Sequence, residues 1–419
     1  MKKKIWIINQ YSTSMGYEKG GRYYWFAKYL KIEGYEPVII TANTFHNSSK
    51  IIETGNNKFI KEVINDITFV FVKTIVALKN DIRRILNMVI FYWNLLSVSM
   101  KLVKYIGKPD IILASSPHPL VMIAGIKIAK KLKIPCLCDI QDLWPEAIFE
   151  FGFLKKNSIL GKLMLKGEHW IYDKADGLIF TKEGELEYIS EMKWDLANGG
   201  VINTDKTHFL TIGVDLDDFN EYKSTYTIDN DKDLDSDKFK VIYTGTIRAV
   251  NNVNKILETA LLLRDCHDSL FIIYGSGFEK DALEKRANDL NLTNIVFKGR
   301  VDKKYIPYIL SKSSVNLLNY KQTGYYLKRG DSSNKLFEYL ASGKPIISSV
   351  KMGYSLIQKY NCGIEIYDAT PEQICDAISE IKNLPKPEYD KLCFNSSLAA
   401  KDFDVKDLSQ QLIKIIENS

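Results

Sequence analysis

Short apolar runs alternate with longer amphipathic runs along almost the whole 419-residue chain, and the alternation starts again from Phe239. The short runs are rich in β-branched residues and almost continuously apolar, as are strands buried on both faces of a parallel sheet. They lie at 4–9, 37–41, 110–114, 135–140, 177–181 and 208–212, and then at 239–244, 270–274, 295–298, 315–318, 345–349 and 363–366. The pattern therefore predicts an α/β protein with two doubly wound domains in tandem.

The interruption between the two arrays suggests the domain boundaries. We expect a first domain at residues 1–214, an acidic linker at 215–238 that is rich in Asp, Asn, Ser and Lys, and a second domain at 239–400. We expect residues 401–419 to form a C-terminal helix that returns to pack on the first domain. The linker contains D-x-D spellings, which can hold a divalent metal on a sugar nucleotide. The general acidity of a surface segment also explains them, so no metal site is predicted.

Composition and missing motifs exclude several classes of protein. The chain is 46% hydrophobic and 26% charged, as globular proteins are, and six cysteines are too few for a disulfide scaffold in a chain of this length. The apolar run after Lys2–Lys4 is only four residues long, so it predicts a first strand and not a signal peptide. P-loop, G-x-S-x-G and H-E-x-x-H motifs are missing from the sequence. These observations predict a reduced, cytoplasmic protein.

Positive charge is concentrated in the first half of the chain. Residues 1–200 carry 28 Lys and Arg against 20 Asp and Glu, whereas the remainder carries 29 against 31. Within that half, the segment Ile82–Lys108 has an apolar centre with aromatic residues and basic flanks. It fits an interfacial helix on an anionic membrane surface, and it equally fits a long core helix of the first sheet. Nucleic-acid binding would also suit the basic charge, but no recognised nucleic-acid motif supports it.

The stretch from Asp331 to Ile347 contains the most informative motif. A polar residue at 332–334 can cap a helix that runs to Ser342, with Gly343 as its stop. The first backbone amides of such a helix, those of Asn334, Lys335 and Leu336, form an anion site. Glu338 lies one turn further along, where its carboxylate can accept hydrogen bonds from a ribose diol while the amides hold the phosphates.

This segment, S-N-K-L-F-E-Y-L-A-S-G-K-P-I-I, resembles the nucleotide-binding helix of family 4 retaining glycosyltransferases. Other stretches resemble the family in the same order along nearly the whole chain: Gly20-Gly21 with 34–40, 139–146, 209–215, 243–248, 274–277 and 297–301. The 139–146 stretch resembles branches that build bacterial capsule or O-antigen polysaccharide. The resemblance implies the GT-B fold, in which two Rossmann-like domains face each other across a cleft.

The resemblance also implies roles for individual residues. The catalytic set is His118, Arg248 and Glu338, and acceptor contacts come from His118, Asp142 and Glu146. Donor contacts come from Gly21, Arg248, Gly275, Arg300, Val301, Asp331, Asn334, Lys335, Leu336 and Glu338. Three positions depart from the family. Its paired glutamates are spaced E-x7-E, which puts Gly330 at the first of them with Asp331 one residue away, and Gln141 replaces the usual His. Val253 stands where the family's phosphate-binding Lys would follow Arg248, and Lys255 comes two residues later.

The function implied is transfer of a sugar, such as an N-acetylamino sugar, from a UDP-linked donor to a lipid-linked saccharide with retention of anomeric configuration. Neither a cofactor nor a metal is expected, because the basic side chains and helix amides offset the charge of the leaving diphosphate. We expect a protein on the inner face of a bacterial cytoplasmic membrane that does not bind nucleic acid. Two alternatives share the fold: a sugar-nucleotide 2-epimerase, and a catalytically silent protein that binds nucleotide sugars.

Overall fold

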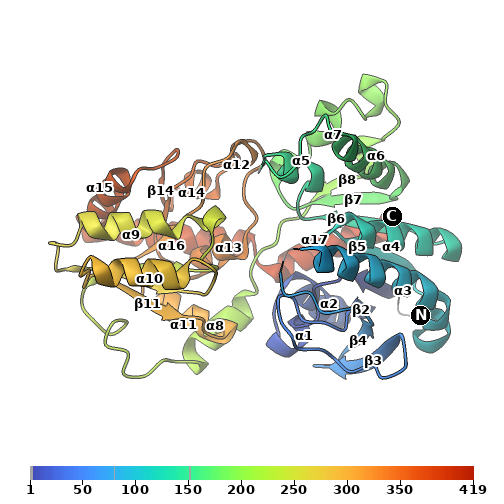
Figure 1. Ribbon diagram of the computed structural model, residues 1–419, viewed down its shortest axis with the longest axis horizontal. Coiled ribbons are helices and arrows are strands. Elements are labelled where there is room, and N and C mark those ends of the chain that lie inside the picture. The colour runs from blue at the N-terminus through green and yellow to red at the C-terminus, as the bar shows by residue number, and fades with distance from the viewer. Residues whose placement is uncertain (1–2, 80, 151) are drawn as a thin grey trace. The chain divides into compact units, whose positions relative to one another are not determined.

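A computed structural model describes residues 3–79, 81–150 and 152–419, which form two α/β units (Figure 1). Unit 1 contains residues 1–211 together with 405–419, and unit 2 contains residues 212–404. The last helix therefore belongs to the first unit, although it follows the second unit in the sequence. The two units are described separately below.

Unit 1 is built on an eight-stranded sheet with the order β3-β4-β2-β1-β5-β6-β7-β8. Its strands are β1 (Lys4–Ile8), β2 (Glu36–Ala42), β3 (Phe59–Ile64), β4 (Ile67–Val72), β5 (Ile111–Ser115), β6 (Cys136–Ile140), β7 (Gly177–Phe180) and β8 (Thr207–Phe209). All pairings are parallel except that of β3 with β4. The order reverses direction at β1, so the carboxyl ends of β1 and β5 flank the position where doubly wound sheets bind ligands.

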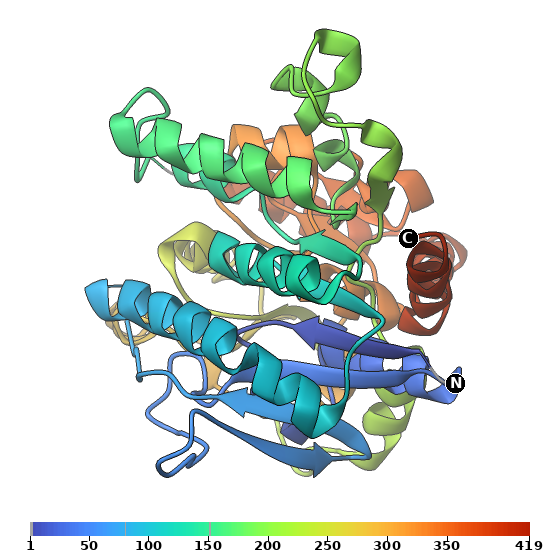
Figure 2. The ribbon, with the colours of Figure 1, turned by 90° about the vertical axis from the view of Figure 1, so that its right-hand side faces the viewer.

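Helices cover both faces of this sheet, which explains why its strands are apolar on both sides. The helices are α1 (Met15–Glu18), α2 (Arg22–Ile32), α3 (Ile82–Ile106), α4 (Pro119–Leu132), α5 (Trp144–Glu150), α6 (Ile159–Lys174), α7 (Tyr188–Glu191) and α17 (Val405–Glu417). Helices α3, α4 and α6 lie side by side on one face (Figure 2), and α2 packs with α17 on the other. Close packing of α4 depends on Gly125, where a Cβ atom would lie 2.5 Å from the Cβ of Ala114.

The strands β3 and β4 form a hairpin that the sequence interpretation did not include. Asn65 and Asp66 occupy its two-residue turn, and both have positive φ (49° and 62°). Turns of this kind match the twist of the paired strands, and Asn and Asp tolerate the left-handed conformation that they need. The hairpin adds an antiparallel edge to a sheet that is otherwise parallel.

Unit 2 repeats the doubly wound design with a six-stranded parallel sheet in the order β11-β10-β9-β12-β13-β14. Its strands are β9 (Phe239–Thr244), β10 (Ser269–Tyr274), β11 (Ile295–Gly299), β12 (Val315–Leu318), β13 (Ile346–Ser348) and β14 (Gly363–Glu365). Its helices are α8 (Leu216–Thr225), α9 (Val253–Leu262), α10 (Lys280–Asp289), α11 (Ile306–Ser311), α12 (Gly324–Arg329), α13 (Asn334–Ala341), α14 (Leu356–Tyr360), α15 (Pro371–Lys382) and α16 (Lys386–Asp402). Separate apolar cores lie on the two faces of the sheet. The direction of strand order changes at β9, between β10 and β12.

The prediction of a linker at 215–238 is wrong, because this segment is a folded part of unit 2. Asp215 caps α8, which contacts α11, and Leu234 is buried in the core. Two acidic side chains of the segment, Asp231 and Asp233, pair with Lys298 at 2.7 and 2.6 Å. A segment with few apolar residues can still be held in place when two buried apolar side chains, Phe219 and Leu234, and two ion pairs anchor it. In sequence such a segment cannot be distinguished from a solvated loop.

Candidate functional site

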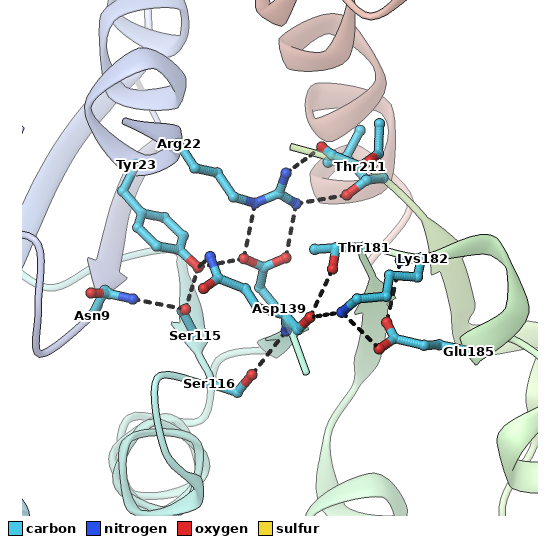
Figure 3. A network of polar contacts seen from close by, with 12 residues as sticks. Asn9, Arg22, Tyr23, Ser115, Ser116, Asp139, Thr181, Lys182, Glu185 and Thr211 are labelled. Atoms are coloured by element: carbon cyan, nitrogen blue, oxygen red, sulfur yellow. Dashed lines mark hydrogen bonds and ion pairs between the residues drawn. The ribbon is translucent and has the colours of Figure 1, made fainter. Parts of the chain in front are cut away.

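A buried ion pair lies at the carboxyl edge of the unit 1 sheet (Figure 3). Arg22, the first residue of α2, donates from Nε and Nη2 to the two carboxylate oxygens of Asp139 in β6, at 3.1 and 2.9 Å. Its remaining hydrogen bonds go to the backbone carbonyls of Thr211 and Leu210. Both side chains are about 98% buried. Two parallel N–H donors meet the two carboxylate oxygens, and each of the three Arg22 nitrogens donates at least one hydrogen bond, an arrangement in which a buried charge pair can persist.

Neutral polar groups extend this ion pair toward the ends of β1 and β5. The hydroxyl of Tyr23 donates to Asp139 Oδ2 at 2.5 Å and also contacts the hydroxyl of Ser115. Asn9 Nδ2 donates to Ser115 Oγ at 2.9 Å, and Gln141 Nε2 donates to the Tyr23 oxygen at 2.9 Å. Burial and the Asp139 charge raise the pKa of Tyr23 well above its ordinary value, so this hydroxyl stays protonated. The network fixes the backbone at the ends of three neighbouring strands.

His118 lies beside this network, at the position that precedes the first residue of α4. The side chain is 1% exposed, and burial lowers its pKa to about 3. His118 is therefore not a solvent-exposed residue, although it stands at the start of a helix. A ring with this pKa is neutral at physiological pH, so it acts through hydrogen bonds and not through charge.

Two amide side chains decide which ring nitrogen of His118 carries the proton. The carbonyl of Ile75 can only accept, so the Asn87 nitrogen donates to it and the Asn87 oxygen accepts from Gln10 Nε2 at 2.5 Å. Gln10 Oε1 then accepts from Nε2–H of His118 at 2.5 Å. Nδ1 is left as the acceptor, and it has no hydrogen-bond partner among the described residues. Asn87 belongs to α3, so this helix takes part in orienting His118.

The other two predicted acceptor residues lie after β6. Asp142 is exposed and pairs with the buried Lys182 at 3.0 Å, and Lys182 also pairs with Glu185 at 3.2 Å. Glu146 is half-buried in the first turn of α5, where its charge also suits the helix dipole. Both carboxylates lie on the same sheet edge as His118, because all three follow neighbouring parallel strands.

Gly21 is positioned by backbone conformation at the N-terminus of α2. Its φ is +103°, and a Cβ atom there would lie 3.1 Å from the side chain of Met15. Glycine is favoured because its φ is positive and α1 packs closely against it. These two features account for Gly21 without a bound ligand.

In unit 2 the predicted nucleotide-binding helix α13 is held at the reversal point of the sheet. The fully buried Tyr339 of α13 accepts a hydrogen bond from the amide of Thr244, the last residue of β9, at 2.9 Å. The first turn of α13 therefore lies near the carboxyl ends of β9 and β12. Doubly wound sheets bind their ligands at this position.

Lys335, in the first turn of α13, is half-buried as a residue, but its ammonium is enclosed without an acceptor among the described residues. Its Nζ lies 4.1 Å from the ring centre of Tyr320, after β12, and 5.0 Å from that of Tyr243, in β9. This Nζ has no hydrogen-bond partner among the described residues. Burial lowers the pKa of Lys335 to about 7, an effect that the nearby Asp331 charge opposes and the Arg248 charge reinforces. The aromatic faces attract the cation, but they do not replace the hydrogen bonds that it would make in water.

Two carboxylates accompany this lysine. Glu338 is 15% exposed and lies 3.4 Å from Nζ of Lys303. Asp331 accepts hydrogen bonds from the amide and the hydroxyl of Ser333, at 2.9 and 2.7 Å. The Asp331 carboxylate thus stabilises the turn that leads into α13. This accounts for an acidic residue at 331 without a donor-sugar contact.

The expectation of three free amides at the start of α13 is wrong in one position. The amide of Leu336 donates to the carbonyl of Ser333 at 3.2 Å, and the Leu336 side chain is buried in the core. The amides of Asn334 and Lys335 come earlier in the first turn. Ser333 is the capping residue, so Leu336 is the third residue of the helix. Its amide bonds to the carbonyl three residues before it, which makes the first turn tighter than a regular α-helical turn.

The remaining predicted donor residues lie in loops at the same edge of the sheet. Arg248 is exposed after β9, Arg300 is exposed after β11, and Val301 is half-buried against the core. Gly275 is explained by packing between loops: a Cβ atom there would lie 1.8 Å from the carbonyl oxygen of Gly245. The described residues contain no group of three or more side chains suited to hold a metal ion.

The sequence interpretation missed Arg22, Asp139, Gln10 and Asn87, although one signal was available. Asp139 stands inside the apolar strand Cys136–Ile140, and a carboxylate in a strand buried on both faces requires a partner. Arg22 opens a helix whose next residues are largely aromatic, which is a second sign of a buried charge. The sequence alone does not show that the two charges meet, since 117 residues separate them.

A comparison with known protein families matches the part of unit 2 that contains Lys335 and Glu338. Residues 225–395 match the family model described as "Glycosyl transferases group 1". These residues form a group 1 glycosyltransferase domain. The match confirms, for this domain, the glycosyltransferase class predicted from the sequence. It includes α13, Lys335 and Glu338.

One relative of described function matches a short stretch of the chain. TuaH of Bacillus subtilis (strain 168), described as a teichuronic acid biosynthesis glycosyltransferase, is 33% identical over 70 residues, which is 17% of this chain and 17% of TuaH. The chain therefore spans about a sixth of the length of that relative in the match.

Solved structures resemble the whole chain in fold. HepE of Anabaena in complex with UDP has a TM-score of 0.69 at 12% identity and covers all of both chains. Sucrose-phosphate synthase of Thermosynechococcus elongatus has a TM-score of 0.68 at 16% identity, over 100% of this chain and 99% of that one. Trehalose 6-phosphate synthase of Burkholderia multivorans has 0.72 at 12%, with the same coverage. The predicted fold class, two Rossmann-like units of the GT-B fold, is confirmed.

Proposed function

We propose that the protein transfers a sugar from a nucleoside diphosphate donor, with unit 2 binding the nucleotide. The observation that carries this proposal is the ammonium of Lys335, which is buried without an acceptor among the described residues at the point where the order of the unit 2 sheet reverses. A diphosphate would supply the acceptor that Lys335 lacks. Glu338, one turn along α13, would accept hydrogen bonds from the ribose hydroxyls.

The same groups would assist the reaction itself. Negative charge develops on the leaving diphosphate as the bond between the sugar and the phosphate oxygen breaks. Positive groups that face the diphosphate stabilise this charge and lower the barrier. Arg248 and Lys335 would supply that charge, so the proposal requires no metal ion. The leaving phosphate would take the proton of the acceptor hydroxyl, which gives retention of anomeric configuration without a carboxylate nucleophile.

We propose a UDP-linked donor and a role in bacterial surface polysaccharide synthesis. HepE, which shares the fold, was solved with UDP and with UDP-glucose, and TuaH is described in terms of teichuronic acid biosynthesis. An N-acetylamino sugar as the transferred group and a lipid-linked saccharide as the acceptor complete the proposal. His118, with a neutral ring and a free Nδ1, would accept a hydrogen bond from a substrate hydroxyl.

We further propose that the protein works on the inner face of the cytoplasmic membrane and binds it through Ile82–Lys108. Helix α3 is long and apolar enough to span a membrane by length and composition. A stripe of its residues is buried in unit 1, including Phe91, Leu95 and Leu102, whereas Ile82, Leu86, Trp93 and Met100 are exposed. Spacings of four and seven residues put the exposed set on one outer face. A helix that lies flat on the surface would satisfy both faces.

The first test is thermal unfolding in the presence of UDP, GDP or ADP. A nucleotide at about 100 times its dissociation constant stabilises the folded state by about 2.7 kcal/mol. We expect UDP to raise the melting temperature of the wild type, and neither Glu338→Ala nor Lys335→Met to respond at the same concentration. Lys359→Met, which removes a lysine near the C-terminus of α14, is the matched control and should respond as the wild type does.

The second test distinguishes a transferase from the alternatives. A transferase releases UDP only when acceptor lipids are added, whereas a 2-epimerase converts the free nucleotide sugar without them. A silent binding protein would show the thermal shift and no turnover with membrane lipids as acceptor. Failure of all three nucleotides to stabilise the protein would contradict the proposal.

A further inference from the structure

A second surface of unit 1 combines exposed apolar side chains with lysines. The segment 152–167, which joins α5 to the first half of α6, contains Phe153 (79% exposed), Ile159 (91%), Leu160 (54%) and Leu163 (62%). The same segment carries four exposed lysines at 155, 156, 162 and 166 and not one Asp or Glu. We call these eight side chains the 153–166 surface. Large apolar side chains that are exposed together mark an interaction site.

Backbone hydrogen bonds and close packing hold this surface in one conformation. The hydroxyl of Ser158 accepts from the amide of Gly161 at 3.1 Å and donates to the carbonyl of Lys155 at 2.7 Å. A Cβ atom on Gly161 would lie 2.5 Å from the Lys155 carbonyl oxygen and 2.7 Å from that of Lys156. The loop is therefore folded tightly onto the first turn of α6, with the backbone of Lys155 and Lys156 against Gly161.

The opposite face of α6 is already in use, so the apolar residues cannot turn inward. Ile171 and Tyr172 are buried, and α6 packs on α4. Ile159, Leu163 and Lys166 are spaced by four and three residues, which places them on one outer face of the helix. Among the described residues, none covers this outer face, on which Ile159 and Leu163 are 91% and 62% exposed.

The 153–166 surface lies in the same helix layer as α3. Helix α4 lies between α3 and α6 and contacts both, and Figure 2 shows the three helices side by side. Each of the three leads into a parallel strand, so their N-termini lie at the carboxyl edge of the sheet, the edge that also holds His118. Helices α3, α4 and α6 together carry ten Lys and Arg against one Glu and one Asp.

We infer that the 153–166 surface binds the surface of an anionic lipid bilayer. Ile159, Leu163 and Phe153 would enter the boundary between headgroups and acyl chains, while the lysines contact the anionic headgroups and keep their charge in water. Four cations without a carboxylate favour this partner over a second copy of the chain, because two such surfaces would repel each other. The inference rests on the proposed function only in the purpose of membrane binding, which would be to hold His118 near a lipid-linked acceptor.

Vesicle co-sedimentation of the full-length protein tests this inference. We compare vesicles of phosphatidylcholine alone with vesicles that contain 30% phosphatidylglycerol, a fraction chosen as roughly that of an anionic leaflet. We expect binding to the anionic vesicles only. Ile159→Ser/Leu163→Ser and, separately, Lys155→Ala/Lys162→Ala should each lower partitioning by about tenfold or more. The matched control, Ile32→Ser/Phe394→Ser, removes two exposed apolar side chains from α2 and α16 and should bind as the wild type does.

Other results would overturn the inference and show which alternative role the surface has. Equal binding by wild type and both variants contradicts it, as does binding that does not distinguish the two kinds of vesicle. A wild-type dimer that light scattering detects and that Ile159→Ser/Leu163→Ser dissociates would assign the surface to self-association instead. The UDP thermal shift, measured on the same samples, separates this failure from failure of the proposed function. Leu86→Ser/Trp93→Ser tests α3 separately, so loss of binding only in that variant would also exclude the 153–166 surface.

Discussion

The carboxyl edges of the two sheets bury charge in opposite ways. In unit 1, Arg22 and Asp139 pair with each other, and Arg22 also donates to the backbone carbonyls of Thr211 and Leu210. In unit 2, Lys335 as a whole is half-buried but its Nζ atom is enclosed, and among the described residues aromatic rings lie against this ammonium and no acceptor does. A saturated charge pair stabilises a scaffold, whereas a buried cation without an acceptor lowers stability until an anion binds. The difference indicates that the Arg22–Asp139 pair is structural, and it supports the proposal that the Lys335 ammonium receives an anionic ligand.

The largest expected effect comes from breaking the saturated pair. Asp139→Asn leaves Arg22 buried without its counter-charge, and removal of one partner of a buried pair costs about 3–5 kcal/mol. Urea unfolding followed by circular dichroism measures this loss. Glu36→Gln is the matched control, because Glu36 pairs with Lys4 at 3.0 Å while 56% exposed, and it should cost less than about 1 kcal/mol. A similar small loss in both variants would mean that Arg22–Asp139 contributes no more than a surface pair.

Glu168 in α6 provides the next test, since unit 1 buries this carboxyl with no cation on it. Burial raises its pKa to about 8, and hydrogen bonds from Tyr188 and Tyr172, at 2.8 and 3.0 Å, only partly oppose that shift. The folded-state pKa lies above the unfolded value near 4.5, so stability is greatest below pH 4.5 and is lost as the pH rises toward 8. Glu168→Gln should therefore gain about 3 kcal/mol at pH 7 and nothing at pH 4. Thermal unfolding across this range checks it, and an unchanged pH profile would contradict it.

The pH dependence of nucleotide binding tests the unit 2 side of the comparison. The pKa of Lys335 lies near 7, so the charged fraction falls above that pH while an anion would favour the charged form. UDP should bind with uptake of about half a proton at pH 7, and its dissociation constant should rise by up to about tenfold per pH unit above 7. Calorimetry in buffers of different ionisation enthalpy measures the proton. Lys335→Met should bind more weakly and without proton uptake, and persistence of the uptake in that variant would assign it to another group.

The smallest expected effect concerns His118. Its pKa near 3 predicts that the ring stays neutral from pH 8 to pH 5, which NMR of the ring nitrogens can follow. Gln10→Glu places a carboxylate on Nε2–H and should raise the pKa of His118 by about 1–2 units. Gln141→Glu changes a neighbouring amide that contacts Tyr23 and not His118, and it should leave the ring nearly unchanged. An ordinary histidine titration near pH 6.5 in the wild type would show that the ring is not buried in solution.

Local sequence patterns predicted most strands, and the reason is visible in particular elements. The strand predicted at 315–318 is β12, and that predicted at 239–244 is β9, because a strand buried on both faces must be apolar throughout. The hairpin at 59–72 was missed, although Asn65-Asp66 between two alternating runs is a recognised turn signal. The segment 215–238 was misassigned because its two buried apolar side chains and its ion pairs leave no periodic pattern.

The sequence likewise predicted those residues of the candidate site that belong to one local motif, and it missed those that lie on separate elements. Glu338, Asn334 and Lys335 were found from sequence because a cap, a short helix and a stop lie within a dozen residues. The amide chain from Asn87 through Gln10 to His118 was not, because its members lie on three separate elements. No spacing rule connects residues 10, 87 and 118.

By itself, the sequence determined the two α/β units, the positions of nearly all strands along the chain and the helix that begins at Asn334, since hydrophobic periodicity and capping are properties of neighbouring residues. Only the tertiary structure decided that Arg22 meets Asp139, that Lys335 lies between two tyrosine rings without an acceptor, and that the outer face of α6 stays uncovered. These features depend on strand order and on which helices share a face. Burial of a charge and exposure of an apolar face both arise from contacts between segments far apart in the chain, which local patterns do not encode.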